Sequence, residues 1–260
     1  MSLTIQIHPT ELRFRGFFIY PKKFRFFEAQ IHIIKSMREQ CIEFTSDKRI
    51  EEYLEDIFFK SNITFNHTVS GNVSEYLFFA DDELKNSIIC GILINFFKLR
   101  ELLKAIPSNG SRSLYALLGA LIGLEQEDET AEIMTKLSSR KVDNVDGFYN
   151  FCLNNLRESW QNLAKLSSRL YSQCCSEDDV YALSVFMLGM DESMSATVIV
   201  NGEELRWEKN GMKIAVVPFF GEREPDIITT LLSQRPSDVV VINPDATSDG
   251  LLSVIRALGE

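Results

Sequence analysis

The sequence predicts an α+β fold, with a mainly helical N-terminal region followed by a small mixed α/β module. Through most of residues 24–190, apolar residues recur every three or four positions, which is the period of a helix face. After Met194 the period changes, and short β-branched runs are separated by Asn-Gly pairs, which favour hairpins. We therefore expect a mainly helical region over residues 1–192, with a short N-terminal β-pair, and an α/β module over residues 193–260.

The first 72 residues predict the β-pair and two helices. Leu3–Ile7 alternates between apolar and polar residues and predicts a strand, for which Arg13–Tyr20 is the candidate partner. Helical spacing of apolar residues predicts one helix over residues 24–44, and a second helix begins at Asp47. The polar stretch Asn62–Asn72 predicts a loop or a short hairpin.

The middle of the chain predicts a series of packed helices. Tyr76–Ile106 has the pattern of one or two helices that end before Pro107. Within this stretch, Ile88–Phe97 is apolar on nearly all sides, which indicates a helix buried among others. Two shorter helices follow, at residues 112–124 and 127–137.

The longest predicted helix runs from Asp146 to Tyr171, and the rest of the chain is organised around it. Asp146 is the candidate N-cap, and about 25 residues at about 1.5 Å each give a rod of roughly 37 Å. We expect this helix to join the two regions. Ser176 then caps a further helix that ends near Met190. The apolar face of the long helix consists of Phe148, Cys152, Leu156, Trp160, Leu163, Leu166 and Leu170.

The C-terminal module is predicted to have the order β-β-β-α-β-α. Asn201-Gly202 and Asn210-Gly211 indicate tight turns, so the first three strands form a meander. The continuous apolar run Val239–Ile242 predicts a strand that is covered on both faces and lies beside one of those three. The other elements are strands at 196–200 and 212–217, a helix at 225–232, and a last helix, capped by Thr247 or Ser248, that ends at Leu258.

Three segments of the chain resemble a known family. They are VDGFYNFCLNNLRESWQNL, SATVIVNGEELRWEKNGMKI and EPDIITTLLSQRPSDVVVINPDATSDGLLSVIRAL, with a short acid-capped helix after the first. This succession, within residues 83–258, is similar to the YtxC-like sporulation proteins of endospore-forming bacteria. The resemblance implies a bacterial, intracellular protein of unassigned activity and supplies no catalytic residue. The family often has His before the Asn that closes the fourth strand, where this chain has Ile242 before Asn243.

Charge is distributed unevenly along the chain, whose formal net charge is −10. Residues 1–50 carry nine Lys or Arg and five Asp or Glu, whereas residues 51–260 carry 18 basic and 32 acidic residues. This acidic body argues against general nucleic-acid binding, because phosphate contacts need clustered Lys and Arg. It favours solubility or a basic partner.

The five cysteines are odd in number and show no C-x-x-C spacing, which predicts a reducing compartment and buried thiols. Cys174 and Cys175 are adjacent, a spacing that disfavours a disulfide between them. Arg13 and Arg15 interrupt any apolar core of a signal peptide, and no run reaches the ~18 apolar residues of a membrane span. The sequence therefore predicts a cytoplasmic protein with no membrane span.

The segment Leu12–Phe27 combines cations with aromatic residues and contains no acid. Such a mixture suits single-stranded nucleic acid, because aromatic rings stack on bases while cations hold phosphates, and it also suits an anionic membrane surface. The simpler interpretation is a strand and a helix start whose Phe side chains are core and whose charges are solvated. The candidate partner or nucleic-acid surface consists of Arg13, Arg15, Lys22, Lys23 and Arg25.

The loops at residues 221–225 and 243–250 are the best candidates for binding a small ligand. The second loop follows a predicted buried strand and precedes a helix, where backbone N–H groups point outward. The alternative is a capped turn in which Asp245 and Ser248 satisfy the backbone. The candidate anion site consists of Arg223, Asn243, Asp245 and Ser248.

No nucleophile, metal or cofactor signature stands out, so we expect no catalytic residue, metal or cofactor. The acidic groups at residues 81–83, 125–129 and 177–179 are typical of helix starts, where the helix dipole favours negative charge. The predicted function is an intracellular binding or regulatory protein without catalytic activity, whose partner is a protein or a second copy. Two alternatives remain open: a ligand-binding protein or enzyme with a site between the two regions, and nucleic-acid binding through Leu12–Phe27.

Overall fold

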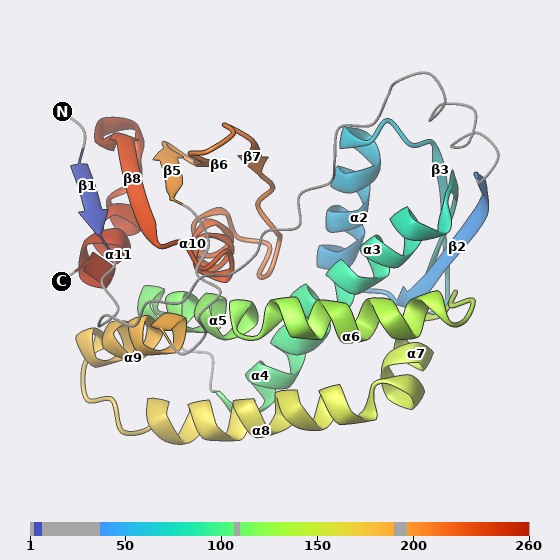
Figure 1. The fold of residues 1–260 in the computed structure, drawn as a ribbon, viewed down its shortest axis with the longest axis horizontal. Helices are drawn as coiled ribbons and strands as arrows, with labels where there is room; N and C mark the ends of the chain where they lie inside the picture. The colour runs from blue at the N-terminus through green and yellow to red at the C-terminus, as the bar shows by residue number, and fades with distance from the viewer. Residues whose placement is uncertain (1–2, 7–36, 107–109, 190–196, 260) are drawn as a thin grey trace. The chain divides into compact units, whose positions relative to one another are not determined.

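The computed structural model of the chain describes residues 3–6, 37–106, 110–189 and 197–259 (Figure 1). Two compact units make up the chain, and both combine helices with strands, so the predicted α+β class is confirmed. The predicted division between residues 192 and 193 falls outside the described residues and stays a prediction. The first unit contains Met1–Phe14, Lys98–Gln126 and Ser159–Glu260, and the second contains Arg15–Phe97 and Glu127–Glu158.

The second unit is built on a three-stranded antiparallel sheet in the order β2-β4-β3. Its strands are β2 (Arg38–Thr45), β3 (Phe65–Ser70) and β4 (Val73–Ala80). The β3–β4 hairpin turns at Gly71, whose φ of +63° is a left-handed conformation that glycine adopts without steric strain. The hairpin alternative for residues 62–72 is thus confirmed from Phe65 onward.

One face of this sheet is buried against helix α2 (Lys48–Lys60), which Figure 1 shows beside the sheet. Phe58 of α2 packs between Tyr76 and Phe78 of β4, with ring centroids 5.9 and 4.8 Å apart. These three side chains are at most 1% exposed, and burying each ring stabilises the fold by about 1.5–3 kcal/mol. Asp47 caps α2 as the sequence predicts.

Two helix predictions in this unit were wrong. The described part of the predicted helix over residues 24–44 is strand β2, and the segment from Tyr76 begins inside β4 instead of a helix. In both strands every second residue is buried, for example Gln40, Ile42 and Phe44. This period of two was concealed by the chance four-residue spacing of Met37 and Cys41, and pairing with β4 decides between the two periods.

After the sheet, α3 (Asp82–Ile92) continues through a π-helical turn (Leu93–Lys98) into α4 (Leu99–Ala105). Residues 88–97 are buried apart from half-buried Gly91 and Asn95, so the predicted buried helix is confirmed. Helix α6 (Gln126–Ser138) confirms the prediction for residues 127–137.

The predicted single helix over residues 146–171 is two helices, α7 (Val145–Cys152) and α8 (Asn154–Tyr171). Leu153 lies between them as the C-cap of α7, with backbone angles of φ −111° and ψ 34°, which are outside the helical region. The predicted cap was also wrong. Asn144 Oδ1 accepts from the Gly147 N–H at 2.6 Å, whereas the Asp146 carboxylate accepts from the Thr45 N–H of β2.

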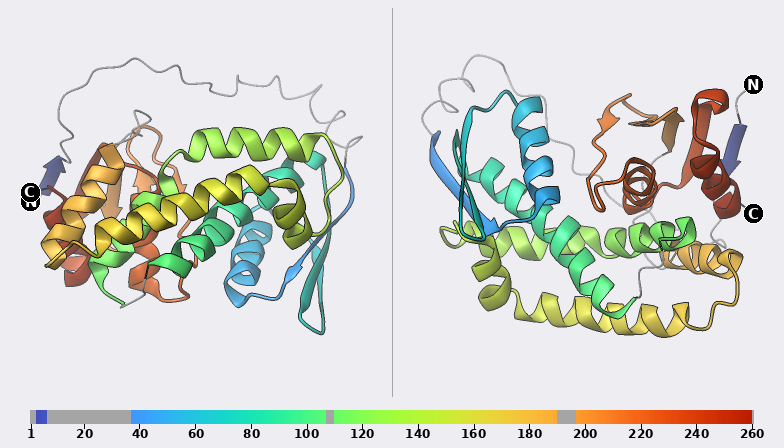
Figure 2. Two further views of the ribbon diagram at one scale, coloured as in Figure 1. Left: turned by 90° about the horizontal axis from the view of Figure 1, so that it is seen from below. Right: turned by 180° about the vertical axis from the view of Figure 1, so that it is seen from behind.

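The first unit contains a five-stranded mixed sheet in the order β1-β8-β5-β6-β7. The second strand in this order, β8, runs antiparallel to β1 and parallel to β5, and the right view of Figure 2 shows it beside β1. Val239 and Val241 of β8 are buried, but Ile242 is 52% exposed, so the prediction that both faces are covered was wrong. The strands are β1 (Leu3–Gln6), β5 (Val198–Asn201), β6 (Glu204–Trp207), β7 (Lys213–Ile214) and β8 (Asp238–Asn243).

Four helices complete the described part of the first unit together with α4 and α8. Helix α5 (Arg112–Gly123) packs against α9 (Glu177–Gly189) and α10 (Arg223–Ser233), and α11 (Asp249–Gly259) contacts α9, α10 and β1. The β-β-β-α-β-α order after residue 196 is confirmed. Among the described residues, no helix has the length and apolar character required to cross a bilayer.

Candidate ligand-binding cavity

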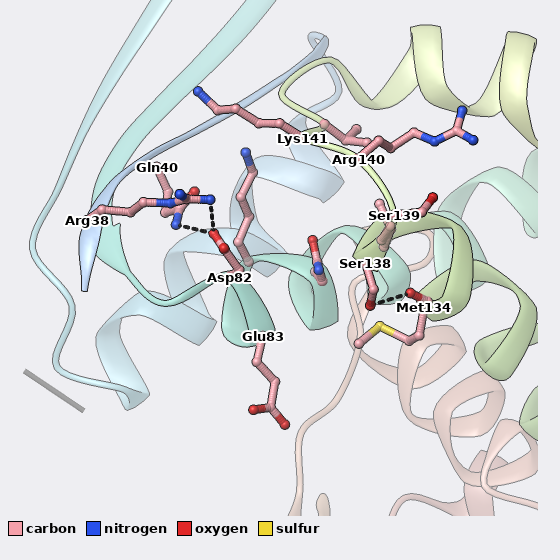
Figure 3. Close-up of a pocket in the computed structure, with 13 residues that line it drawn as sticks. Arg38, Gln40, Asp82, Glu83, Met134, Ser138, Ser139, Arg140 and Lys141 are labelled. Carbon is pink, nitrogen blue, oxygen red and sulfur yellow. Dashed lines mark hydrogen bonds and ion pairs between the residues drawn. The ribbon is translucent and has the colours of Figure 1, made fainter. Parts of the chain in front are cut away.

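A cavity of about 490 Å³ lies within the second unit, and Figure 3 shows the side chains around it. Three segments line it: the start of β2, the first turns of α3, and the end of α6 with the loop that follows. This volume lies in the range of about 300–1,000 Å³ that small-molecule sites occupy. Its polar lining consists of Arg38, Gln40, Asp82, Glu83, Lys85, Asn86, Ser138, Ser139, Arg140 and Lys141.

Asp82 anchors one side of the cavity. Asp81 caps α3 by accepting from the Leu84 N–H at 2.8 Å, which places Asp82 in the first helical turn. Asp82 Oδ1 accepts from Gln40 Nε2 at 2.9 Å and from Arg38 Nη2 at 2.6 Å (Figure 3). The hydrogen bond from Gln40 and the ion pair with Arg38 lower the pKa of the Asp82 carboxyl.

Gln40 carries a buried acceptor. Its side chain lies on the buried face of β2, is 1% exposed, and donates from Nε2 to the Ala80 carbonyl at 3.2 Å as well as to Asp82. Among the described residues, no donor lies within hydrogen-bond distance of its Oε1. Buried polar atoms are nearly always paired, so this oxygen calls for an explanation.

Lys85 and Lys141 supply positive charge on the other side. Lys85 Nζ lies 2.5 Å from Asp143 Oδ1, and Lys141 Nζ lies 3.4 Å from Asp143 Oδ2. Burial acts to raise the pKa of Asp143, but the contacts with Lys85 and Lys141 outweigh it, and the pKa is lowered. In Figure 3 the Lys141 side chain extends towards the side of Arg38, whereas Arg140 extends in the opposite direction.

The end of α6 contributes hydroxyl oxygens. Ser138 Oγ donates to the Met134 carbonyl and Ser139 Oγ donates to the Lys136 carbonyl, each at 2.8 Å. These bonds satisfy carbonyls of the last helical turn and use the hydroxyl hydrogens. The two serine hydroxyl oxygens are therefore left to act as acceptors. The cavity thus combines cations, which suit an anion, with several acceptors, which suit hydroxyl or amine donors.

A second cluster gathers metal-ligating groups on the opposite face of the same sheet. Glu43 and Glu75 are directly paired across β2 and β4, and Cys41 Sγ lies 3.9 and 3.7 Å from their carboxylates. One ligand atom of each residue lies within 4.8 Å of the others. Burial, followed by the charges of Glu43, Glu75 and Asp143, raises the pKa of Cys41 to about 12, so the thiol is protonated at neutral pH.

The predicted anion site is dispersed in the first unit. Arg223 lines a cavity of about 570 Å³ beside the start of α10, and its Nε donates to Glu203 at 2.9 Å. Ser248 caps α11 by accepting from the Leu251 N–H, and its hydroxyl donates to Glu224, which lines that cavity. Asn243 at the end of β8 and Asp245 in the following 3₁₀ turn are not among the residues that line it. Anion binding there stays a prediction.

The candidate nucleic-acid surface formed by Arg13, Arg15, Lys22, Lys23 and Arg25 lies outside the described residues and stays a prediction. The expectation of buried thiols was correct for Cys90 but wrong for Cys175, which is exposed on the loop after α8. None of the five cysteines, all of them described, forms a disulfide.

Sequence reasoning missed the cavity, although it singled out residues 81–83 as a helix start. The missing signal was the strand pairing of β2 with β4, which places Gln40 and Arg38 beside Asp82 from 42 and 44 residues away. Comparisons of the chain with family models, curated proteins and solved structures found no match. The fold and the cavity therefore define an α+β protein with a polar, cation-lined pocket, and the sporulation-family resemblance stays a prediction.

Proposed function

We propose that this chain is a non-catalytic binding or regulatory protein that takes a small anionic ligand in the cavity of the second unit. The observation that carries the proposal is a local reversal of charge. Four basic and two acidic side chains line the cavity, in a chain with 27 basic and 37 acidic residues. With Asp143, the partner of Lys85 and Lys141, the count becomes four basic and three acidic side chains, and Arg140 is the basic one that extends away from Arg38 and Lys141 (Figure 3).

Electrostatics favours an anion at this position. A concave site in which basic side chains outnumber acidic ones raises the local concentration of anions. The Arg38–Asp82 ion pair is exposed, with both side chains 57% accessible, and such pairs contribute only about 0–1 kcal/mol. An incoming anion can therefore compete for the Arg38 guanidinium, whose planar donors match phosphate oxygens.

The test is isothermal titration of inorganic phosphate at low ionic strength. We expect the protein to bind phosphate, and the double variant Arg38→Gln, Lys141→Gln to weaken binding about tenfold or more, because two charge-assisted contacts are lost. Lys165→Gln is the matched control, since Lys165 is an exposed lysine of α8 that does not line the cavity. Absence of heat at millimolar phosphate, or equal affinity in the double variant, would contradict the proposal.

We propose that ligand binding controls contact with a protein partner or with a second copy of the chain. We also propose that the protein acts in a sporulating bacterium. Phe59 and Phe151 of the second unit are 86% and 81% exposed and are the candidate contacts for such a partner. The bacterial sporulation context rests on the family resemblance of residues 83–258. If it is correct, disruption of the coding sequence in an endospore-forming host lowers the count of heat-resistant spores, and complementation restores it. An unchanged count would remove this part of the proposal.

A further inference from the structure

We infer that the anion bound in this cavity is a phosphate monoester that carries hydroxyl groups of its own, and that Gln40 accepts a hydrogen bond from one of them. This inference rests on the proposed function and adds the class of ligand. It is carried by the buried acceptor of Gln40 and by the mixture of charges and acceptors around it.

The orientation of the Gln40 amide is fixed by its neighbours. Nε2 donates to two oxygens, the Ala80 carbonyl and Asp82 Oδ1, so a flipped amide would face Oε1 towards two acceptors. The atom of the amide that has no hydrogen-bond partner among the described residues is consequently the acceptor Oε1. It belongs to a side chain that is 99% buried and lines the cavity. A buried acceptor without a donor is destabilising, and a ligand O–H group would remove that cost.

Arg38 lies beside Gln40 at the cavity. Arg38 Nη2 and Gln40 Nε2 donate to the same oxygen of Asp82, so the guanidinium lies beside the amide. Because the Arg38 side chain is 57% exposed, it can turn towards a bound phosphate without breaking core packing.

The rest of the lining distinguishes a hydroxylated ligand from a bare anion. Ser138 and Ser139 use their hydroxyl hydrogens on backbone carbonyls, and Glu83 is a further acceptor at the cavity. Ligand hydroxyl groups can donate to these exposed oxygens in place of water. A phosphate is preferred to a carboxylate because its three peripheral oxygens can contact Arg38, Lys85 and Lys141 from three separate segments.

The experiment compares two probes of nearly equal size on the full chain: glycerol 3-phosphate and propyl phosphate, which differ by two hydroxyl groups. We expect glycerol 3-phosphate to bind about 5- to 10-fold more tightly in isothermal titration, the effect of one net hydrogen bond. In Gln40→Met the ratio of the two affinities falls, because the acceptor of one ligand hydroxyl group is lost. In Lys141→Gln both affinities fall together and the ratio is retained, because that change affects the phosphate alone.

The outcomes separate this inference from the proposed function. If propyl phosphate binds the native protein as tightly as glycerol 3-phosphate, the inference is overturned and anion binding stands. If neither probe binds, both are overturned. If Gln40→Met fails to fold, Gln40→Asn replaces it, since the shorter amide cannot reach the same position. A ratio that survives in the folded variant overturns the role of Gln40.

Discussion

At the residue scale, the cavity depends on one carboxylate shared by two donors. Asp82 Oδ1 accepts from both Gln40 and Arg38, which come from the same strand two residues apart. Alternate residues of a strand point to the same side, so β2 delivers both donors to the start of α3. Asp82 thereby links the buried face of the sheet to the exposed rim of the cavity.

This arrangement predicts a measurable change in the pKa of Asp82. Gln40→Met removes the larger of the two favourable contributions, so the lowered pKa rises towards its ordinary value of 3.8, as measured by carbon-13 NMR titration of the side-chain carboxyl. Arg38→Met is the comparison variant and produces a smaller rise. An unchanged pKa in Gln40→Met would show that the hydrogen bond does not hold the carboxylate.

The sign of the associated stability effect follows from linkage. The folded-state pKa of Asp82 lies below the unfolded value, so the stabilisation is present above the unfolded pKa of about 3.9. It is lost as the pH falls through the lowered folded value. The pH-dependent part of the stability difference between Gln40→Met and the native protein is therefore expected to vanish at acidic pH, when Asp82 is protonated in both proteins.

At the scale of elements, the sequence analysis predicted helix caps and a tight turn correctly. Ser176 and Ser248 cap α9 and α11 as expected, since a cap involves residues three apart in the chain. Asn201-Gly202 marks the β5–β6 turn, where Gly202 has φ +62°. Each of these features is decided within a few residues, so the pattern contains the information.

The errors occurred where distant segments decide the local structure. Strand β2 was predicted as a helix because its partners in β4 lie 28 to 42 residues further along, and β4 was itself predicted as helix from Tyr76. The break at Leu153 leaves no signal in the sequence, because the apolar spacing continues from Cys152 to Leu156 without interruption. Spacing along the chain also does not reveal how closely α5 approaches α10 at Gly119, where a Cβ atom would lie 2.6 Å from the Thr229 carbonyl oxygen. The cavity was missed for the same reason, as three separate segments form it.

At the scale of the whole molecule, segments from both ends of the sequence form one sheet. Strand β1 near the N-terminus pairs with β8, whose residues are 238–243, in the register Leu3 to Val241. On its other side β8 pairs with β5, so β1 closes an edge that β8 would otherwise expose. An unpaired edge strand presents backbone N–H and C=O groups to other chains, and apolar edges favour aggregation.

Deletion of residues 1–6 therefore leaves β8, with its run Val239–Ile242, as an open edge. We expect a lower urea midpoint by circular dichroism and concentration-dependent light scattering, because four register pairs are lost and the apolar edge becomes available to a second chain. Deletion of residues 1–2 alone is the control, since it precedes β1 and retains the pairing.

Adding Val240→Lys to the longer deletion should suppress the scattering without restoring the urea midpoint, because a charge on the edge blocks intermolecular pairing but does not replace the lost strand. Equal midpoints for the two deletions would show that β1 contributes nothing to the stability of the sheet.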